Sequence, residues 1–265
     1  MKKQILFLVV ILILILTGCT QKNDEEVTYY ISKTMIKQGT GDISLREHTY
    51  DENWNPLTAS ITLNGKFSSM TEYVYSDDYS MVTQNYTSAI YDPSSTTIIR
   101  TFDEKGQVIR AETYDGDRHI STAENTYDIS GNVILSILSY PESDFATTLS
   151  RTYDKNNNLI TYHMDTGYMT TRIEYHYDQD DRIIREENYK NNELETYCEY
   201  QWQKNTAYIT NYSANGTQGS KTKVIYDDVG NVLVNEVTDA NGNLHSCSYN
   251  EYIGTDGSIS SGIPD

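Results

Sequence analysis

The chain contains a short repeat: an aromatic residue, an aspartate, two variable residues, a glycine or asparagine, a polar residue and two apolar residues. A fixed internal period limits the fold strongly, because each copy must form the same local structure. The copies begin at Phe102, Tyr127, Tyr153, Tyr177 and Tyr226, with a degenerate copy at Thr238 and an early outlier at Tyr50. The first four starts are 25, 26 and 24 residues apart, and the degenerate copy follows its neighbour by 12. The elementary unit is therefore one strand plus one turn, about 12 residues.

Each part of the repeat has a physical reason. The aspartate side chain accepts a hydrogen bond from a backbone N–H two residues on, which starts a turn. Glycine or asparagine near the end of the turn tolerates a positive φ. The flanks are rich in strand-forming residues, and alternation places several of them on one face. Those that share a face are Ile173, Tyr175 and Tyr177 on one segment and Cys198, Tyr200 and Trp202 on another.

These features predict an all-β fold, an antiparallel meander of short hairpin repeats that follows an N-terminal signal helix. No helical period is found after Leu16, so helix is expected to be scarce there. With 24 tyrosines and modest aliphatic content, the covered face of the sheet should be largely tyrosine. We expect an open, single-layer sheet that curls as twisted sheets do.

Residues 172–183, from Arg172 through the aspartate at 178 to Ile183, resemble the YD repeats of the RHS (rearrangement hotspot) family. Residues 226–232 are similar, and the resemblance covers about residues 99–250. In that family such repeats form a curling strip of hairpins that can enclose a toxin domain. About a dozen strands are expected here, too few for a closed shell, and no separate domain follows. The resemblance therefore implies the strip architecture and contacts at the cell surface, and not the toxin function.

The N-terminus reads as an export signal. Lys2 and Lys3 precede twelve apolar residues, 5–16, which as a helix would span about 18 Å against a hydrocarbon core of about 30 Å. Leu16-Thr17-Gly18-Cys19 resembles the lipobox of bacterial lipoproteins. That resemblance implies cleavage before Cys19 and acylation of the protein there, with diacylglycerol on the sulfur and fatty acids such as palmitate. The alternative is an uncleaved anchor with an incidental cysteine. Both place the body of the protein outside the cytoplasm, lipid-anchored or membrane-anchored.

The expected organisation has five parts. These are a lipoprotein signal peptide (1–18), a flexible tether (19–26), an irregular β segment (27–98), the YD-like β-hairpin repeats (99–252) and a disordered tail (253–265). The formal net charge of −18 opposes nucleic-acid binding, which needs clustered Lys and Arg.

Few residues suggest a metal site or catalysis. The densest acidic cluster, Asp178, Asp180 and Asp181, is a weak candidate for Ca²⁺, and turn formation explains the same residues. His176 alternates with tyrosines and is expected on a solvent-facing side of a strand. No metal-binding histidine motif, nucleophile elbow or phosphate-binding loop occurs. We therefore expect no cofactor and no enzymatic activity.

Aromatic rows are the weak candidates for binding: Tyr175, Tyr177, Tyr200 and Trp202. The alternative reading is that these side chains only cover the sheet. Cys198 and Cys247 lie about four strands apart in the expected meander, about 19 Å, beyond disulfide reach. They are predicted to be unpaired unless the sheet curls tightly.

Together these observations favour a surface-anchored bacterial lipoprotein with a non-catalytic β-repeat module for binding or spacing. One alternative is a glycan- or cell-wall-binding protein that uses tyrosine-rich sheet faces. A second is an extracytoplasmic hydrolase with a pocket in the irregular segment 57–98. The expected partners are the membrane, through Cys19, and an unknown surface protein or glycan.

Overall fold

The computed structural model describes residues 28–90 and 93–264. They form one antiparallel sheet in which each strand pairs with the next along the chain. The strands are β1 (Tyr29–Gln38), β2 (Ile43–Tyr50), β3 (Pro56–Leu63), β4 (Lys66–Tyr75), β5 (Met81–Ser88), β6 (Ser94–Phe102), β7 (Val108–Asp115), β8 (Arg118–Tyr127), β9 (Val133–Ser139), β10 (Ala146–Tyr153), β11 (Leu159–Asp165), β12 (Thr170–Tyr177), β13 (Ile183–Lys190), β14 (Glu193–Gln203), β15 (Thr206–Ser213), β16 (Gln218–Tyr226), β17 (Val232–Thr238), β18 (Leu244–Gly254) and β19 (Ile259–Ser261).

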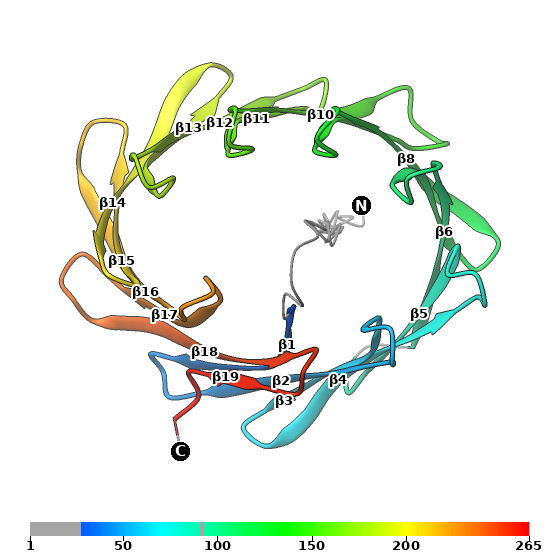
Figure 1. Cartoon of the computed structure of the whole chain (residues 1–265), viewed down its shortest axis with the longest axis horizontal. Coiled ribbons are helices and arrows are strands. Elements are labelled where there is room, and N and C mark those ends of the chain that lie inside the picture. Colours follow the sequence, from blue (N-terminus) through cyan, green and yellow to red (C-terminus); the bar gives the residue numbers. More distant parts are fainter. Residues whose placement is uncertain (1–27, 91–92, 265) are drawn as a thin grey trace, which may run out of the picture.

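The sheet closes into a barrel because β1 pairs with β18 from Tyr29↔Gly254 to Gln38↔Ser246, and Figure 1 shows the resulting ring. The all-β prediction is confirmed, but the prediction of an open, curling meander is wrong. Residues 27–98 were expected to be irregular, yet they supply β1–β5 and the start of β6. With these strands the twist accumulates far enough for the first strand to meet the eighteenth, and closure removes both free edges.

The two chain ends differ from the expectation in different ways. The predicted signal peptide (1–18), Cys19 and the tether (19–26) lie outside the described residues. The segment 253–265 was expected to be disordered, but Ile259–Ser261 forms β19, which pairs with the end of β18. The Ser260 hydroxyl donates to Asp227 Oδ2 at 2.6 Å, which ties this segment to the turn between β16 and β17.

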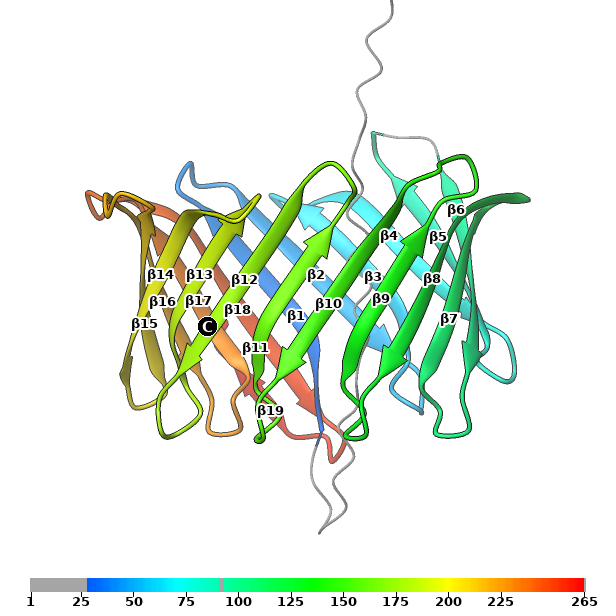
Figure 2. The same ribbon diagram turned by 90° about the horizontal axis from the view of Figure 1, so that it is seen from above.

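The barrel flares from a narrow rim to a wide rim, as Figure 2 shows. The repeat turns that follow the even-numbered strands lie at the narrow rim. In the turn after β12, the Asp178 N–H donates to the Arg182 carbonyl at 2.9 Å. Asp178 Oδ1 accepts the backbone N–H groups of Asp180 and Arg182 at 2.9 and 3.0 Å, and Asp181 has φ of 58°. The predicted turn chemistry is confirmed, although the degenerate copy at Asp239 joins β17 to β18 at the wide rim.

The aromatic residue that opens the repeat joins neighbouring turns at the narrow rim. Tyr177 ends β12, and its hydroxyl donates to the Leu159 carbonyl at the start of β11, at 2.8 Å. The same bond recurs around the barrel, and we call these side chains rim clamps. They are Tyr50 to Ile31, Tyr75 to Pro56, Tyr127 to Val108, Tyr153 to Val133, Tyr177 to Leu159, Trp202 to Ile183 and Tyr252 to Val232.

Candidate functional site

The two faces of the barrel wall can be told apart on β12. The Thr170 carbonyl accepts the Asn191 N–H and the Asp178 N–H donates to Arg182, so the even-numbered residues of β12 bond toward β13. In a strand of L-residues, the side toward which a residue's backbone N–H and C=O point determines the sheet face on which its side chain lies. β12 runs toward the narrow rim with β13 beside it (Figure 2), so the side chains of its even-numbered residues point outward. The odd-numbered residues, Tyr175 and Tyr177 among them, therefore point into the lumen. The strand pairing carries this assignment around the barrel.

The outer face is charged. On β12–β14 the Arg172 guanidinium lies 2.8 Å from Glu174, and Arg185 lies 2.8 Å from Glu187. Elsewhere Lys33 pairs with a glutamate at 3.4 Å. Each outward cation placed at a bilayer midplane costs about 2–4 kcal/mol. The cost falls to about 0–1 kcal/mol near the interfaces, and Arg110, Arg172 and Arg185 lie close to the starts of their strands. The charges of this face thus favour water over lipid by an amount that depends on their depth.

The inner face is aromatic and only partly covered. A ring of 18 strands at a spacing of about 4.8 Å and a tilt of about 40° has a backbone diameter of about 36 Å, too wide for side chains from opposite walls to meet. Burial agrees: among the described residues, Val82 is the one large side chain with less than 2% of its surface exposed. The lumen is therefore solvated, and its lining is accessible to a ligand.

The four aromatic residues predicted to bind all lie on this inner face. Tyr175, Tyr177, Tyr200 and Trp202 are each partly exposed. Together with Tyr162 on β11, which Arg151 covers at 5.5 Å, and Tyr226 on β16, whose ring centroid lies 5.5 Å from that of Trp202, we call them the lumenal aromatic patch. Tyr177 and Trp202 are rim clamps, so their polar groups are committed to the fold. Tyr175 and Tyr200 are not clamps.

A carboxylate that sequence reasoning missed lies within the lumenal aromatic patch. Glu186 on β13 pairs with Tyr175 on one side and Cys198 on the other. Its Oε1 accepts the Asn188 amide at 3.0 Å, and its Oε2 accepts the Tyr200 hydroxyl at 3.4 Å. Burial, and secondly the Glu186 charge, raises the pKa of Tyr175 to about 12 and that of the Cys198 thiol to about 11. The sequence signal for Glu186 was the alternation of residues on β12 and β14, combined with the pairing of β13 between them, which places Glu186 on the same face as Tyr175 and Cys198.

The cysteines are separated as expected. Cys198 on β14 points into the lumen, where its thiol donates to Asn211 Oδ1 at 2.8 Å. Cys247 on β18 is buried on the outer side, opposite Glu236. Both are free, which agrees with the prediction that they are unpaired.

The weak calcium candidates form part of a turn at the narrow rim. Arg182 Nη2 lies 2.9 Å from Asp178 Oδ2 and 3.0 Å from Asp180 Oδ2, so a guanidinium already sits between two of the carboxylates. Asp181 Oδ1 accepts the side-chain amides of Asn156 and Asn158 from the neighbouring turn. The arrangement favours turn formation and contact between turns over a cation site.

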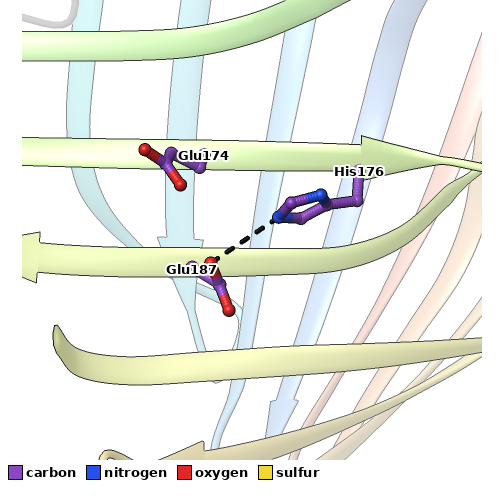
Figure 3. Close-up of side chains that lie close together, drawn as sticks. All are labelled: Glu174, His176 and Glu187. Atoms are coloured by element: carbon purple, nitrogen blue, oxygen red, sulfur yellow. Dashed lines mark ion pairs between the residues drawn. The ribbon is translucent and has the colours of Figure 1, made fainter.

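Strand pairing brings together a second cluster on the outer face: Glu174, His176 and Glu187. Figure 3 views this wall from outside, with strands of the opposite wall behind it. One ligand atom from each residue lies within 4.8 Å of the others. His176 Nε2 is 3.6 Å from Glu187 Oε2, and its side chain is 49% exposed, as expected for a solvent-facing position. A metal ion here would compete with the arginine paired to each carboxylate, so the cluster is best described as a surface charge network.

A shallow pocket of about 460 Å³ lies beside β3 and β4, largely within the segment where a hydrolase site was considered. Its lining includes Asp51 and Asp77 from neighbouring turns, together with Tyr73 and Tyr75. Asp51 Oδ1 accepts the backbone N–H groups of Asn53 and Asn55 and serves the turn. The pocket therefore provides no pair of free carboxylates.

No helix in the described part of the chain is long and apolar enough to cross a membrane.

Comparisons with known proteins show no family. No protein-family model matches the chain, and no curated protein matches it. Among solved structures, a porin-like protein from Bacteroides uniformis shares 9% identity, covering 87% of this chain and 98% of that one, with a TM-score of 0.49. The TcdB2-TccC3 structure without its hypervariable C-terminal region shares 12% identity, with a TM-score of 0.31. That alignment covers 82% of this chain and 16% of the other, so the chain spans about a sixth of that protein's length.

The closed barrel corrects the functional interpretation made from sequence. The strip-like binding or spacer module and its glycan-binding alternative assumed an open sheet with accessible edges and faces. Instead β1 and β18 pair with each other, and the tyrosine rows chosen as binding faces line a lumen.

Proposed function

We propose that the protein is a non-catalytic, extracytoplasmic barrel that holds a basic polypeptide segment of another surface protein in its lumen. The observation that supports this is the distribution of side chains across the wall. The inner face is aromatic and partly exposed and also carries Arg46, Arg100 and Arg151, whereas the ion pairs of β12–β14 lie on the outer face. A soluble barrel with a packed interior would have the opposite inner face, dry and aliphatic.

Charge selects the ligand class. The formal net charge is −18, and it becomes −20 if cleavage removes Lys2 and Lys3. The narrow rim bears an aspartate in most of its turns, including Asp128, Asp178 and Asp227. A basic segment is attracted by this field, and its cationic side chains can stack on tyrosine faces. An acidic segment or a nucleic acid would be repelled.

Lipid attachment at Cys19 completes the proposal and gives the barrel an orientation. Residues 20–28 separate Cys19 from β1, and they reach at most about 32 Å when fully extended. Because β1 begins at the narrow rim, that rim would face the membrane and the wide rim would face outward (Figure 2). The relation of the turns to RHS YD repeats is likewise proposed, on the strength of the repeat pattern.

The two tryptophans provide a direct test. Trp54 lies in a turn, stacked on Tyr30 at 4.9 Å, whereas Trp202 lies in the lumen. In a Trp54→Phe variant, Trp202 becomes the single reporter of lumenal binding. A lysine-rich peptide should change its fluorescence in a saturable way, and a glutamate-rich peptide of equal length should not. Equal responses to both peptides, or a response to neither, would contradict the proposal.

A further inference from the structure

We propose that Glu186, with the flanking Tyr175 and Tyr200, forms a subsite in the lumen for an alkylammonium group, the side chain of a lysine in the bound segment. This inference rests on the proposed function and specifies which ligand group the lumen recognises.

Glu186 is distinguished by what it lacks. On the outer face each of its counterparts has a cation: Glu174 has Arg172 at 2.8 Å, and Glu187 has Arg185 at 2.8 Å. Among the ion pairs of the described residues none includes Glu186, whose oxygens accept only the Asn188 amide and, at 3.4 Å, the Tyr200 hydroxyl. Two neutral donors leave acceptor capacity on both carboxylate oxygens. A partly buried carboxylate without a counter-charge favours a cationic ligand.

The surroundings of Glu186 suit an organic cation. Tyr175 stands directly across the strand pair from Glu186, so their Cβ atoms are about 5 Å apart. Tyr200 reaches the carboxylate from the strand on the other side. Tyr162, which pairs with Ile173 farther along the same inner face, already has the Arg151 guanidinium 5.5 Å from its ring centroid, so Tyr175 and Tyr200 are the rings of the subsite. An ammonium group bound to Glu186 would thus lie beside tyrosine rings and hydroxyls, which stabilise cations within about 6 Å of a ring.

The same surroundings do not suit a metal ion. Ca²⁺ takes six to eight oxygen ligands and Mg²⁺ demands an octahedral set. Here one carboxylate is surrounded by neutral side chains, including Asn188 and Cys198. A lysine ammonium needs only three acceptors, which one carboxylate and one tyrosine hydroxyl nearly supply.

The test uses the Trp54→Phe background and two consecutive glutamates that point to opposite faces of the wall, Glu186 and Glu187. Glu186→Gln removes the lumenal charge, and Glu187→Gln removes the charge of the next residue, which points outward. We expect Glu186→Gln to weaken binding of a lysine-rich peptide by about 10- to 100-fold, as for loss of a charge-assisted hydrogen bond. Glu187→Gln should change it less than threefold. Acetylation of the peptide lysines should weaken binding to the parent at least as much as Glu186→Gln does.

Two further measurements separate the possible failures. Far-ultraviolet circular dichroism and thermal melts must show that both variants keep the barrel, and Glu186→Asp should recover part of the affinity if charge is what matters. Binding of n-butylammonium alone, measured by NMR saturation transfer, should be strongest in the parent, weaker in Glu186→Asp and weakest in Glu186→Gln. Butylammonium binding without peptide binding would overturn the proposed function and keep the subsite. Peptide binding that is equal in Glu186→Gln and the parent would overturn the subsite and keep the function.

Discussion

The rim clamps predict a measurable stability loss when one hydroxyl is removed. Tyr177→Phe deletes the 2.8 Å bond to the Leu159 carbonyl and leaves the ring in place. A neutral hydrogen bond contributes about 0.5–1.5 kcal/mol, and the carbonyl at a rim can regain water, so we expect a loss of about 1 kcal/mol. For a chain of this size that corresponds to a decrease in Tm of about 2–4 °C. Urea denaturation followed by circular dichroism should show a lower midpoint with an unchanged slope.

The chain offers matched controls for this prediction. Tyr208 on the outer face of β15 is 39% exposed, so Tyr208→Phe should stay within about 0.5 kcal/mol of the parent. Phe102 ends β6 at a clamp position without a hydroxyl. Phe102→Tyr should therefore be neutral or stabilising. If Tyr177→Phe and Tyr208→Phe gave the same change in midpoint, the clamp would have no energetic role and the reasoning would be refuted.

Three further predictions follow from the same structure. Hydrogen bonds from Ser76 and Ser80 lower the pKa of Asp78 to about 2. A lowered folded pKa stabilises the fold above the unfolded pKa of about 4, so thermal melts should show stability lost as pH falls from about 4 to 2; flat melts over that range would contradict this. Cys198 and Cys247 should both react with a thiol reagent in the unreduced, denatured protein, and a titre below two would point to a disulfide. Because the outer face is charged, residues 20–265 without a lipid anchor should release no dye from lipid vesicles. Dose-dependent release would show that this face tolerates lipid.

Local chemistry was predictable from sequence, and closure was not. The Asp178 turn follows from residues within five positions of one another, which is the range over which sequence patterns act. The pairing of Tyr29 with Gly254 joins residues that no local pattern connects. The segment before residue 99 has drifted turns such as the one at Asp78, where serine hydroxyls replace the repeat. Its strands were therefore undercounted, and an open sheet was inferred.

The candidate site shows the same division. Alternation placed Tyr175 with Tyr177, and Tyr200 with Trp202, on common faces, and the structure agrees. Closure of the barrel decides which face of the sheet is concave. The sequences of β12 and β14 alone therefore could not show that these aromatic rows point inward. Glu186 was hidden for a related reason, because its neighbours Tyr175 and Cys198 come from strands on both sides.

The pairing of β1 with β18 also sets an order for assembly. Residues 29–38 cannot find their partner until residues 246–254 exist, so the first strand emerges from synthesis or export with an unsatisfied edge and keeps it until nearly the whole chain is present. Closure is a contact of very high sequence separation, and such contacts form late and slowly. Any truncation before β18 would leave two free strand edges on every molecule, each open to pairing with another copy and so to open-ended polymers.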